Sequence, residues 1–264
     1  MPIPPAAQAD AVPPRYRGVW QRTLLRTGDM NDTTSTVFWL QTAQWHADIR
    51  IPAQRPDFSS VDCFAACSPA QLAWLAGQQG FAGVTTVSAT LPKETCRWRR
   101  LIDFQPPGTY EDAGHLSFKP TRLVETGAHA DYLEHWCRLP DTGNGFVVLR
   151  KSAGDGALAS PAEFLMVAGD YVMHVRDRAR EWPRAVRPGT TLSELIRPEH
   201  VEWLDLEISF GERIESGWRV RHSTLPWREG RSVDLQMQWA EEGFVTMLWD
   251  GVPAQWQILE WAPR

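Results

Sequence analysis

The sequence predicts an all-β protein built of two antiparallel barrels in tandem, with two short helices. Segments in which apolar and polar residues alternate with period two recur along the whole chain, and about fifteen of them are long enough to form strands. No strand–helix–strand alternation and no glycine-rich phosphate loop interrupts the series. Because one small barrel uses roughly eight to ten strands, we expect a barrel in each of residues 15–145 and 146–264, after a flexible tail at residues 1–14.

The first barrel is expected to begin with strands at Gly18–Leu25, Thr34–Thr42 and Trp45–Ile51. Side chains of a strand alternate between its two faces. The third strand therefore places Ala47, Ile49 and Ile51 on one face, and His46, Asp48 and Arg50 on the other. Pro52 ends this strand, because proline cannot donate a hydrogen bond to a ladder.

Two segments carry the start signals of helices. Ser68 is a good N-cap before Pro69, and Gly80 follows the apolar residues of this segment, so a helix is expected within Ser68–Gln79. Thr191 and Glu194 have the spacing of a capping box and predict a second, shorter helix up to Ile196.

The remaining segments with period-two alternation are read as strands. They are Phe81–Val87, Cys96–Phe104, His115–Phe118, Arg122–Glu125, Ala130–Arg138, Gly145–Lys151, Phe164–Val167, Tyr171–Arg176, Trp203–Phe210, Trp218–Thr224, Val233–Trp239, Phe244–Trp249 and Trp256–Trp261.

Composition excludes several classes of protein. A net charge of −5 has the wrong sign for binding a phosphate backbone, so we expect no nucleic-acid partner. No apolar run approaches the ~20 residues that cross a bilayer, and the N-terminus lacks the order of a signal peptide, so we expect a cytoplasmic protein with no membrane partner. The 4 cysteines form no Cys-x-x-Cys pair, so we expect reduced thiols, no metal site and no cofactor.

Several strings, spread over residues 18–230, resemble a known group of proteins. They are Phe38-Trp-Leu-Gln-Thr42, Asp48-Ile-Arg-Ile-Pro-Ala53 with Arg55-Pro-Asp-Phe58, Gln79-Gly-Phe-Ala-Gly83, Ile102-Asp-Phe-Gln-Pro-Pro107, His129-Ala-Asp-Tyr132 with Glu134 and Trp136, and Ser223-Thr-Leu-Pro-Trp-Arg-Glu-Gly230. The chain is thus similar to bacterial relatives of the fungal HRI-type lipocalin-like proteins. The resemblance implies a calycin-type fold with two lipocalin-like barrels, and it supplies no catalytic residues.

The first candidate site is the polar face of Trp45–Ile51. A histidine beside a carboxylate can be held in one tautomer and act as a base, and an arginine beside them can hold an anion. His46, Asp48 and Arg50 fit these roles, but the same pattern is also typical of a solvated outer face with Ala47, Ile49 and Ile51 inside.

The second candidate site is the strand predicted near Ala130–Arg138. His129, Asp131 and His135 share one face, and Tyr132, Glu134 and Trp136 share the other, so neither face is cleanly apolar. An ionisable group turned into a barrel has to be paired, hydrogen-bonded or neutral. By contrast, Glu207 lies opposite Leu206 and Ile208 and is expected on an outer face.

We therefore predict that a barrel binds a small, largely apolar, aromatic molecule, because 14 Trp side chains and a few polar anchors suit such a pocket. The predicted ligand-binding residues are Trp39, Gln41, His46, Asp48, Asp131 and Trp136. The alternative is an enzyme, a lyase, isomerase, cyclase or hydratase without a cofactor, that acts on an aromatic or polyketide-like substrate. Its proton-transfer residues would be His129, Tyr132 and Glu134, with Arg50 to stabilise negative charge. A third reading is a protein–protein module without a ligand. The sequence does not indicate an oligomeric state.

Overall fold

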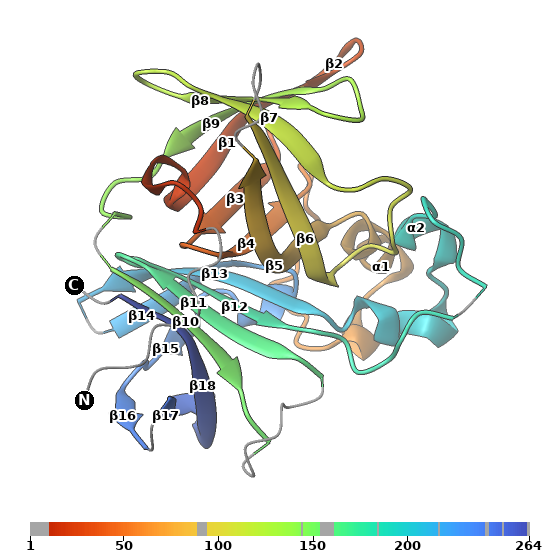
Figure 1. The fold of residues 1–264 in the computed structure, drawn as a ribbon. Coiled ribbons are helices and arrows are strands. Elements are labelled where there is room, and N and C mark those ends of the chain that lie inside the picture. Colours follow the sequence, from red (N-terminus) through yellow and green to blue (C-terminus); the bar gives the residue numbers. More distant parts are fainter. Residues whose placement is uncertain are drawn as a thin grey trace.

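The computed structural model confirms the all-β prediction. It describes residues 11–88, 94–143, 145–153, 161–183, 185–215, 217–240, 243–249 and 251–262. Two antiparallel sheets follow each other along the chain and pack face to face (Figure 1). Most of the predicted tail, residues 1–10, lies outside the described residues.

The first sheet contains nine strands. They are β1 (Gly18–Thr27), β2 (Met30–Asp32), β3 (Thr36–Gln41), β4 (Trp45–Ile51), β5 (Gln79–Ser88), β6 (Thr95–Asp103), β7 (Ala113–Phe118), β8 (Leu123–Gly127) and β9 (Leu133–Arg138). β1 pairs with β3 on one side and with β9 on the other, which closes eight of these strands into a barrel. β2 only extends the far end of β1 as a hairpin.

The second sheet also contains nine strands. They are β10 (Phe146–Lys151), β11 (Glu163–Ala168), β12 (Tyr171–Arg176), β13 (Glu207–Ile214), β14 (Gly217–Ser223), β15 (Ser232–Val233), β16 (Met237–Trp239), β17 (Phe244–Trp249) and β18 (Val252–Ala262). Its edge strands are β15 and β16, which follow each other in the chain but share no ladder among the described residues. The sheet is therefore a half-barrel rather than a second closed ring.

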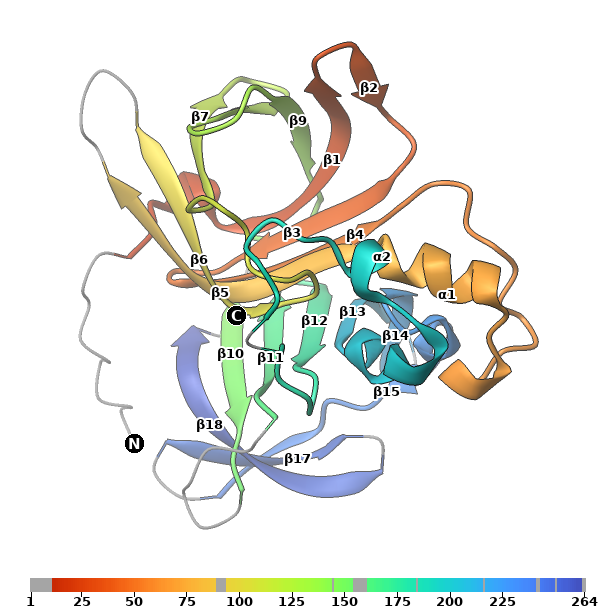
Figure 2. The same cartoon turned by 90° about the vertical axis from the view of Figure 1, so that its right-hand side faces the viewer.

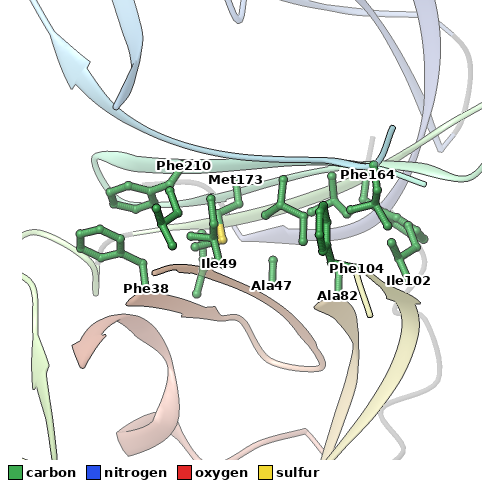
Figure 3. Close-up of a cluster of buried hydrophobic side chains, with 14 of the residues drawn as sticks. Phe38, Ala47, Ile49, Ala82, Ile102, Phe104, Phe164, Met173 and Phe210 are labelled. Carbon is green, nitrogen blue, oxygen red and sulfur yellow. The ribbon is translucent and has the colours of Figure 1, made fainter. Parts of the chain in front are cut away.

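The largest apolar core lies between the barrel and the half-barrel (Figure 3). Ala47 and Ile49 of β4 face Met173 of β12 across this layer, and the rings of Phe38 and Phe210 stack with centroids 4.2 Å apart. The apolar residues of β4 thus point out of the barrel and are still buried. The intervening residues of β4 consequently point into the barrel.

Both predicted helices are present. α1 (Pro69–Ala76) begins after Ser68, whose side chain forms a capping box with Gln71, and α2 (Leu192–Leu195) begins after Thr191 with a capping box to Glu194. The two helices contact each other beside the layer between the sheets (Figure 2). In the described part of the chain, no helix is long and apolar enough to cross a bilayer.

The start of the chain closes one end of the barrel. Val12 and Tyr16 are fully buried against Trp20 and Phe118, and Tyr16 lies in the short 3₁₀ helix Pro14–Tyr16 that precedes β1. The opposite end, at the far end of β1, is not filled in this way and contains the site described below.

We predict that Phe210→Ala lowers the free energy of unfolding by about 3–5 kcal/mol, because it leaves a cavity in the layer that joins the sheets. Urea unfolding followed by tryptophan fluorescence measures this loss. Leu248→Ala is the control, because Leu248 is 46% exposed and its truncation should change stability by less than about 0.5 kcal/mol. A loss below about 1 kcal/mol for Phe210→Ala would show that the layer does not hold the sheets together.

Candidate functional site

The barrel interior contains a partly open cavity of about 300 Å³. Four aromatic rings form much of its wall, with the Trp39 ring in edge contact with those of Trp98 and Trp136 at centroid distances of 5.7 and 5.9 Å. Phe81 completes this aromatic wall. Trp39 and Trp136, the two tryptophans predicted to bind a ligand, thus lie in the cavity wall.

The polar face of β4 points into the barrel. Asp48 and Arg50 line the cavity, while Ala47 and Ile49 on the other face belong to the layer between the sheets. The reading in which Ala47, Ile49 and Ile51 fill the barrel is wrong, because the second sheet covers them from outside.

His46 and Gln41 lie at the closed end of the barrel and do not line the cavity. Thr85 Oγ1 donates to Gln41 Oε1 at 2.8 Å, so it accepts a hydrogen bond from His46 Nδ1–H at 2.9 Å. Burial, and then the positive charge of Arg100, lower the pKa of His46 to about 3. His46 is therefore neutral and takes part in the buried hydrogen bonds at this end of the barrel.

Three arginines hold the carboxylates of the barrel in place. Arg50 donates from Nε and Nη2 to the two carboxylate oxygens of Asp48, at 2.8 and 3.3 Å. Arg22 donates from Nη1 to Glu134 at 2.7 Å and from Nη2 to Asp32 at 2.9 Å. Arg50 Nη1 also lies 3.7 Å from Glu134. Removing one member of such a buried pair would leave an uncompensated charge and destabilise the fold.

Arg100 enters the site through an irregularity in β6. The register between β5 and β6 shifts between Ala82 and Gly83, so that Trp98 faces the barrel interior and Ile102 faces the second sheet. Arg100 donates to Asp112 and to Asp103, and its guanidinium carbon lies 3.7 Å from the centre of the Phe81 ring.

Glu125 is the residue that sequence reasoning missed. It lies directly opposite Glu134 in the β8–β9 ladder, and it accepts hydrogen bonds from Tyr132 Oη at 2.8 Å and from Trp136 Nε1 at 3.1 Å. Burial, and then the nearby charge of Glu134, raise the pKa of Glu125 well above its usual value. Glu125 thus favours the protonated form inside the cavity.

Tyr132 and Glu134 line the cavity, but His129 and Asp131 do not. Both are exposed in the loop before β9, and the His129 ring stacks on Tyr110 outside the barrel. The period-two alternation of a strand does not extend to His129 and Asp131, because β9 begins only at Leu133. The prediction that His129 acts beside Tyr132 and Glu134 in the barrel is therefore wrong. The prediction that Asp131 binds a ligand there is wrong for the same reason.

A wider cleft of about 1120 Å³ lies outside the barrel wall. It shares Trp98, Arg100, Asp112 and Tyr132 with the lining of the interior cavity. The β6–β7 ladder extends only from Thr95–His115 to Arg97–Ala113. Beyond it, the wall is held by a backbone hydrogen bond from Trp98 N–H to the Asp112 carbonyl at 2.9 Å and by the Arg100–Asp112 ion pair. The cavity adjoins the outer cleft at this point.

Glu207 does not lie on a solvated outer face. It is 4% exposed on the face of the second sheet turned away from the barrel, where it accepts a hydrogen bond from Arg228 Nε at 3.0 Å and lies 3.3 Å from His174 Nδ1. Although burial opposes ionisation, His174 and Arg228 lower the pKa of Glu207 to about 2. The alternation in the sequence was correct, but the half-barrel buries both of its faces.

Among the described residues, no group of three or more His, Cys, Asp or Glu side chains is placed to hold a metal ion. Comparisons of the chain with protein-family models, curated proteins and solved structures found no match.

We predict that Glu125→Gln changes the pH dependence of stability. The folded protein binds the Glu125 proton more tightly than the unfolded chain does, so the stability from this group is present below about pH 4.5 and is lost as the pH rises towards the folded-state pKa. The variant lacks this loss. Between pH 5 and pH 8, the difference in free energy of unfolding, variant minus parent, should therefore increase by at least about 1 kcal/mol.

Urea unfolding at a series of pH values measures this difference. Glu181→Gln is the control, because Glu181 is exposed. Parallel pH profiles for the parent and Glu125→Gln would show that Glu125 has no raised pKa in the folded protein.

Proposed function

We propose that the closed barrel binds a small aromatic molecule in its interior cavity. The observation that carries this proposal is the cavity of about 300 Å³ lined by Trp39, Phe81, Trp98 and Trp136. An apolar cavity of roughly 150 Å³ takes up benzene, so twice that volume accommodates one or two rings. The rings of the wall offer edge-to-face and stacked contacts to such a ligand.

The polar groups of the cavity support a ligand with one polar end. Asp48, Arg50, Glu125, Tyr132 and Glu134 line the same cavity as the aromatic rings, and most of their polar atoms are already bonded to each other or to Arg22. A few placed polar groups in an aromatic pocket fix a ligand's orientation. Access from the outer cleft would pass the Arg100–Asp112 pair. The resemblance to lipocalin-like proteins is consistent with this function.

We predict that 2-naphthol binds with saturable quenching of tryptophan fluorescence and raises the melting temperature. Ligand at 100 times its Kd stabilises the folded state by about 2.7 kcal/mol. Leu25→Trp should weaken binding by at least about tenfold, because Leu25 lines the cavity and an indole there would fill it.

The control is Leu248→Trp, which adds the same indole at an exposed position of the half-barrel. Circular dichroism checks that both variants fold. Equal affinity of the two variants would place the ligand outside the barrel.

One observation favours a second candidate function, a proton-transfer enzyme. Burial raises the pKa of Glu125 beside the cavity, so it keeps its proton to a higher pH than a free carboxyl does; it is hydrogen-bonded to Tyr132, and Glu134 lies opposite it. On an aromatic ketone, Glu125 would give its proton to the carbonyl oxygen while Glu134 takes a proton from the α-carbon. Arg50 would stabilise the negative charge that develops on the carbonyl oxygen during this transfer. This assignment gives Glu125 the role that the sequence gave to His129.

For this second candidate, we predict that the protein exchanges the α-protons of propiophenone for deuterium in D₂O, measured by NMR. Glu125→Gln should slow the exchange by about 10²–10⁴-fold, the usual contribution of a general acid. His129→Ala should leave the rate unchanged, because His129 lies outside the barrel. Exchange no faster than in buffer would rule out this function for the ketone class.

A further inference from the structure

The carboxyl groups that line the cavity outnumber the guanidinium groups that line it. Four carboxyl groups line it, together with two guanidinium groups. Three of the four carboxyls have an arginine partner, in the pairs Asp48–Arg50, Asp112–Arg100 and Glu134–Arg22. The fourth, Glu125, forms no ion pair among the described residues, and its hydrogen-bond partners are the neutral Tyr132 hydroxyl and Trp136 indole.

Protein groups cover Glu125 on its other sides, so a counter-ion could approach it from the cavity. On β7, a Cβ at Gly114 would lie 2.9 Å from Glu125 Oε1, so the carboxyl already packs against that backbone. The charged groups nearest to it are Glu134 and Asp112, which are acidic, and Arg50, which is already engaged by Asp48. Glu125 itself is 4% exposed.

A second group of the wall lacks a partner. Trp39 is 2% exposed, and its indole N–H has no acceptor among the described residues although Trp39 lines the cavity. Buried polar groups in proteins are nearly always hydrogen-bonded. The indole N–H needs an acceptor, which the ammonium group of a ligand does not provide, so the charge of the ligand is inferred from Glu125 alone.

We propose that the ligand of the cavity is an aromatic amine, whose ammonium group forms an ion pair with Glu125 when it binds. This inference rests on the proposed ligand-binding function and specifies its chemical class. The ammonium would donate a charge-assisted hydrogen bond to the carboxylate, and the indole faces around it favour a cation. The aromatic ring would lie against Trp39, Trp98 and Trp136.

An anionic ligand fits the same cavity less well. Arg50 is engaged by Asp48 and approached by Glu134, and Arg100 is engaged by Asp103 and Asp112. An anion would therefore compete with carboxylates that already hold both guanidinium groups, in a site where carboxyls outnumber guanidiniums. Such like-charge contacts are unfavourable in a site of low dielectric constant.

Binding of an amine should release a proton. Burial, and then the charge of Glu134, hold the pKa of Glu125 well above its usual value in the free protein, and an adjacent cation lowers it again. The Glu125 proton then leaves to the buffer as the ammonium binds. A neutral ligand of the same shape has no such effect.

The test is isothermal titration calorimetry at pH 7 with three ligands of similar shape: tryptamine, neutral 3-ethylindole and anionic indole-3-propionate. Tryptamine should bind at least about tenfold more tightly than 3-ethylindole, and indole-3-propionate should bind most weakly. Titrations in phosphate and in Tris, which differ in ionisation enthalpy, should show up to about one proton released per tryptamine bound.

Glu125→Gln separates the inference from a general affinity for indoles. The variant should lose the tryptamine preference and the proton release, so that its Kd values for tryptamine and 3-ethylindole differ by less than about twofold. Glu181→Gln, at an exposed position, should behave as the parent does.

Two results would overturn the inference. If 3-ethylindole binds as tightly as tryptamine, or if Glu125→Gln keeps the preference, the amine assignment is wrong while the proposed binding function stands. If no compound of any charge binds, both are wrong.

Discussion

The fold depends on one apolar layer, which lies between the outer wall of the barrel and the half-barrel (Figure 3). Strands β3 and β4 contribute every second side chain to this layer. The pleat then turns the intervening residues of β4, among them Asp48 and Arg50, into the barrel. The apolar contact between the two units thus dictates that the interior of the barrel contains charged groups.

Charged groups inside a barrel require partners. The ion pairs that they form here leave part of the interior unfilled, and this space is the cavity. Arg22, Arg50 and Arg100 bind carboxylates of the wall, which keeps these long side chains along the strands. The start of the chain fills the other end of the barrel with Val12 and Tyr16. The half-barrel follows the same principle, because its face away from the layer carries the buried cluster of His174, Glu163 and Glu207. In that sheet, however, apolar side chains such as Trp218, Met247 and Trp256 pack the concave face.

The period-two alternation predicted the all-β class, and the capping residues Ser68 and Thr191 predicted both helices, because these signals are local. The face of β4 that points inward could not be predicted, since both faces are buried. The same reason explains the error at Glu207. Glu125 could not be found from the sequence, because its pairing with Glu134 depends on the register of two strands. The Arg22–Glu134 contact depends on closure of the barrel, which joins residues 112 positions apart.

The central claim is that the interior of the closed barrel takes up an aromatic molecule. The most direct measurement is a crystal structure of the protein grown with 4-bromophenethylamine, with the bromine located by its anomalous scattering. The account predicts a bromine peak inside the ring of strands, against Trp39, Trp98 and Trp136. Bromine found only outside the barrel, with the interior filled by side chains, would contradict it.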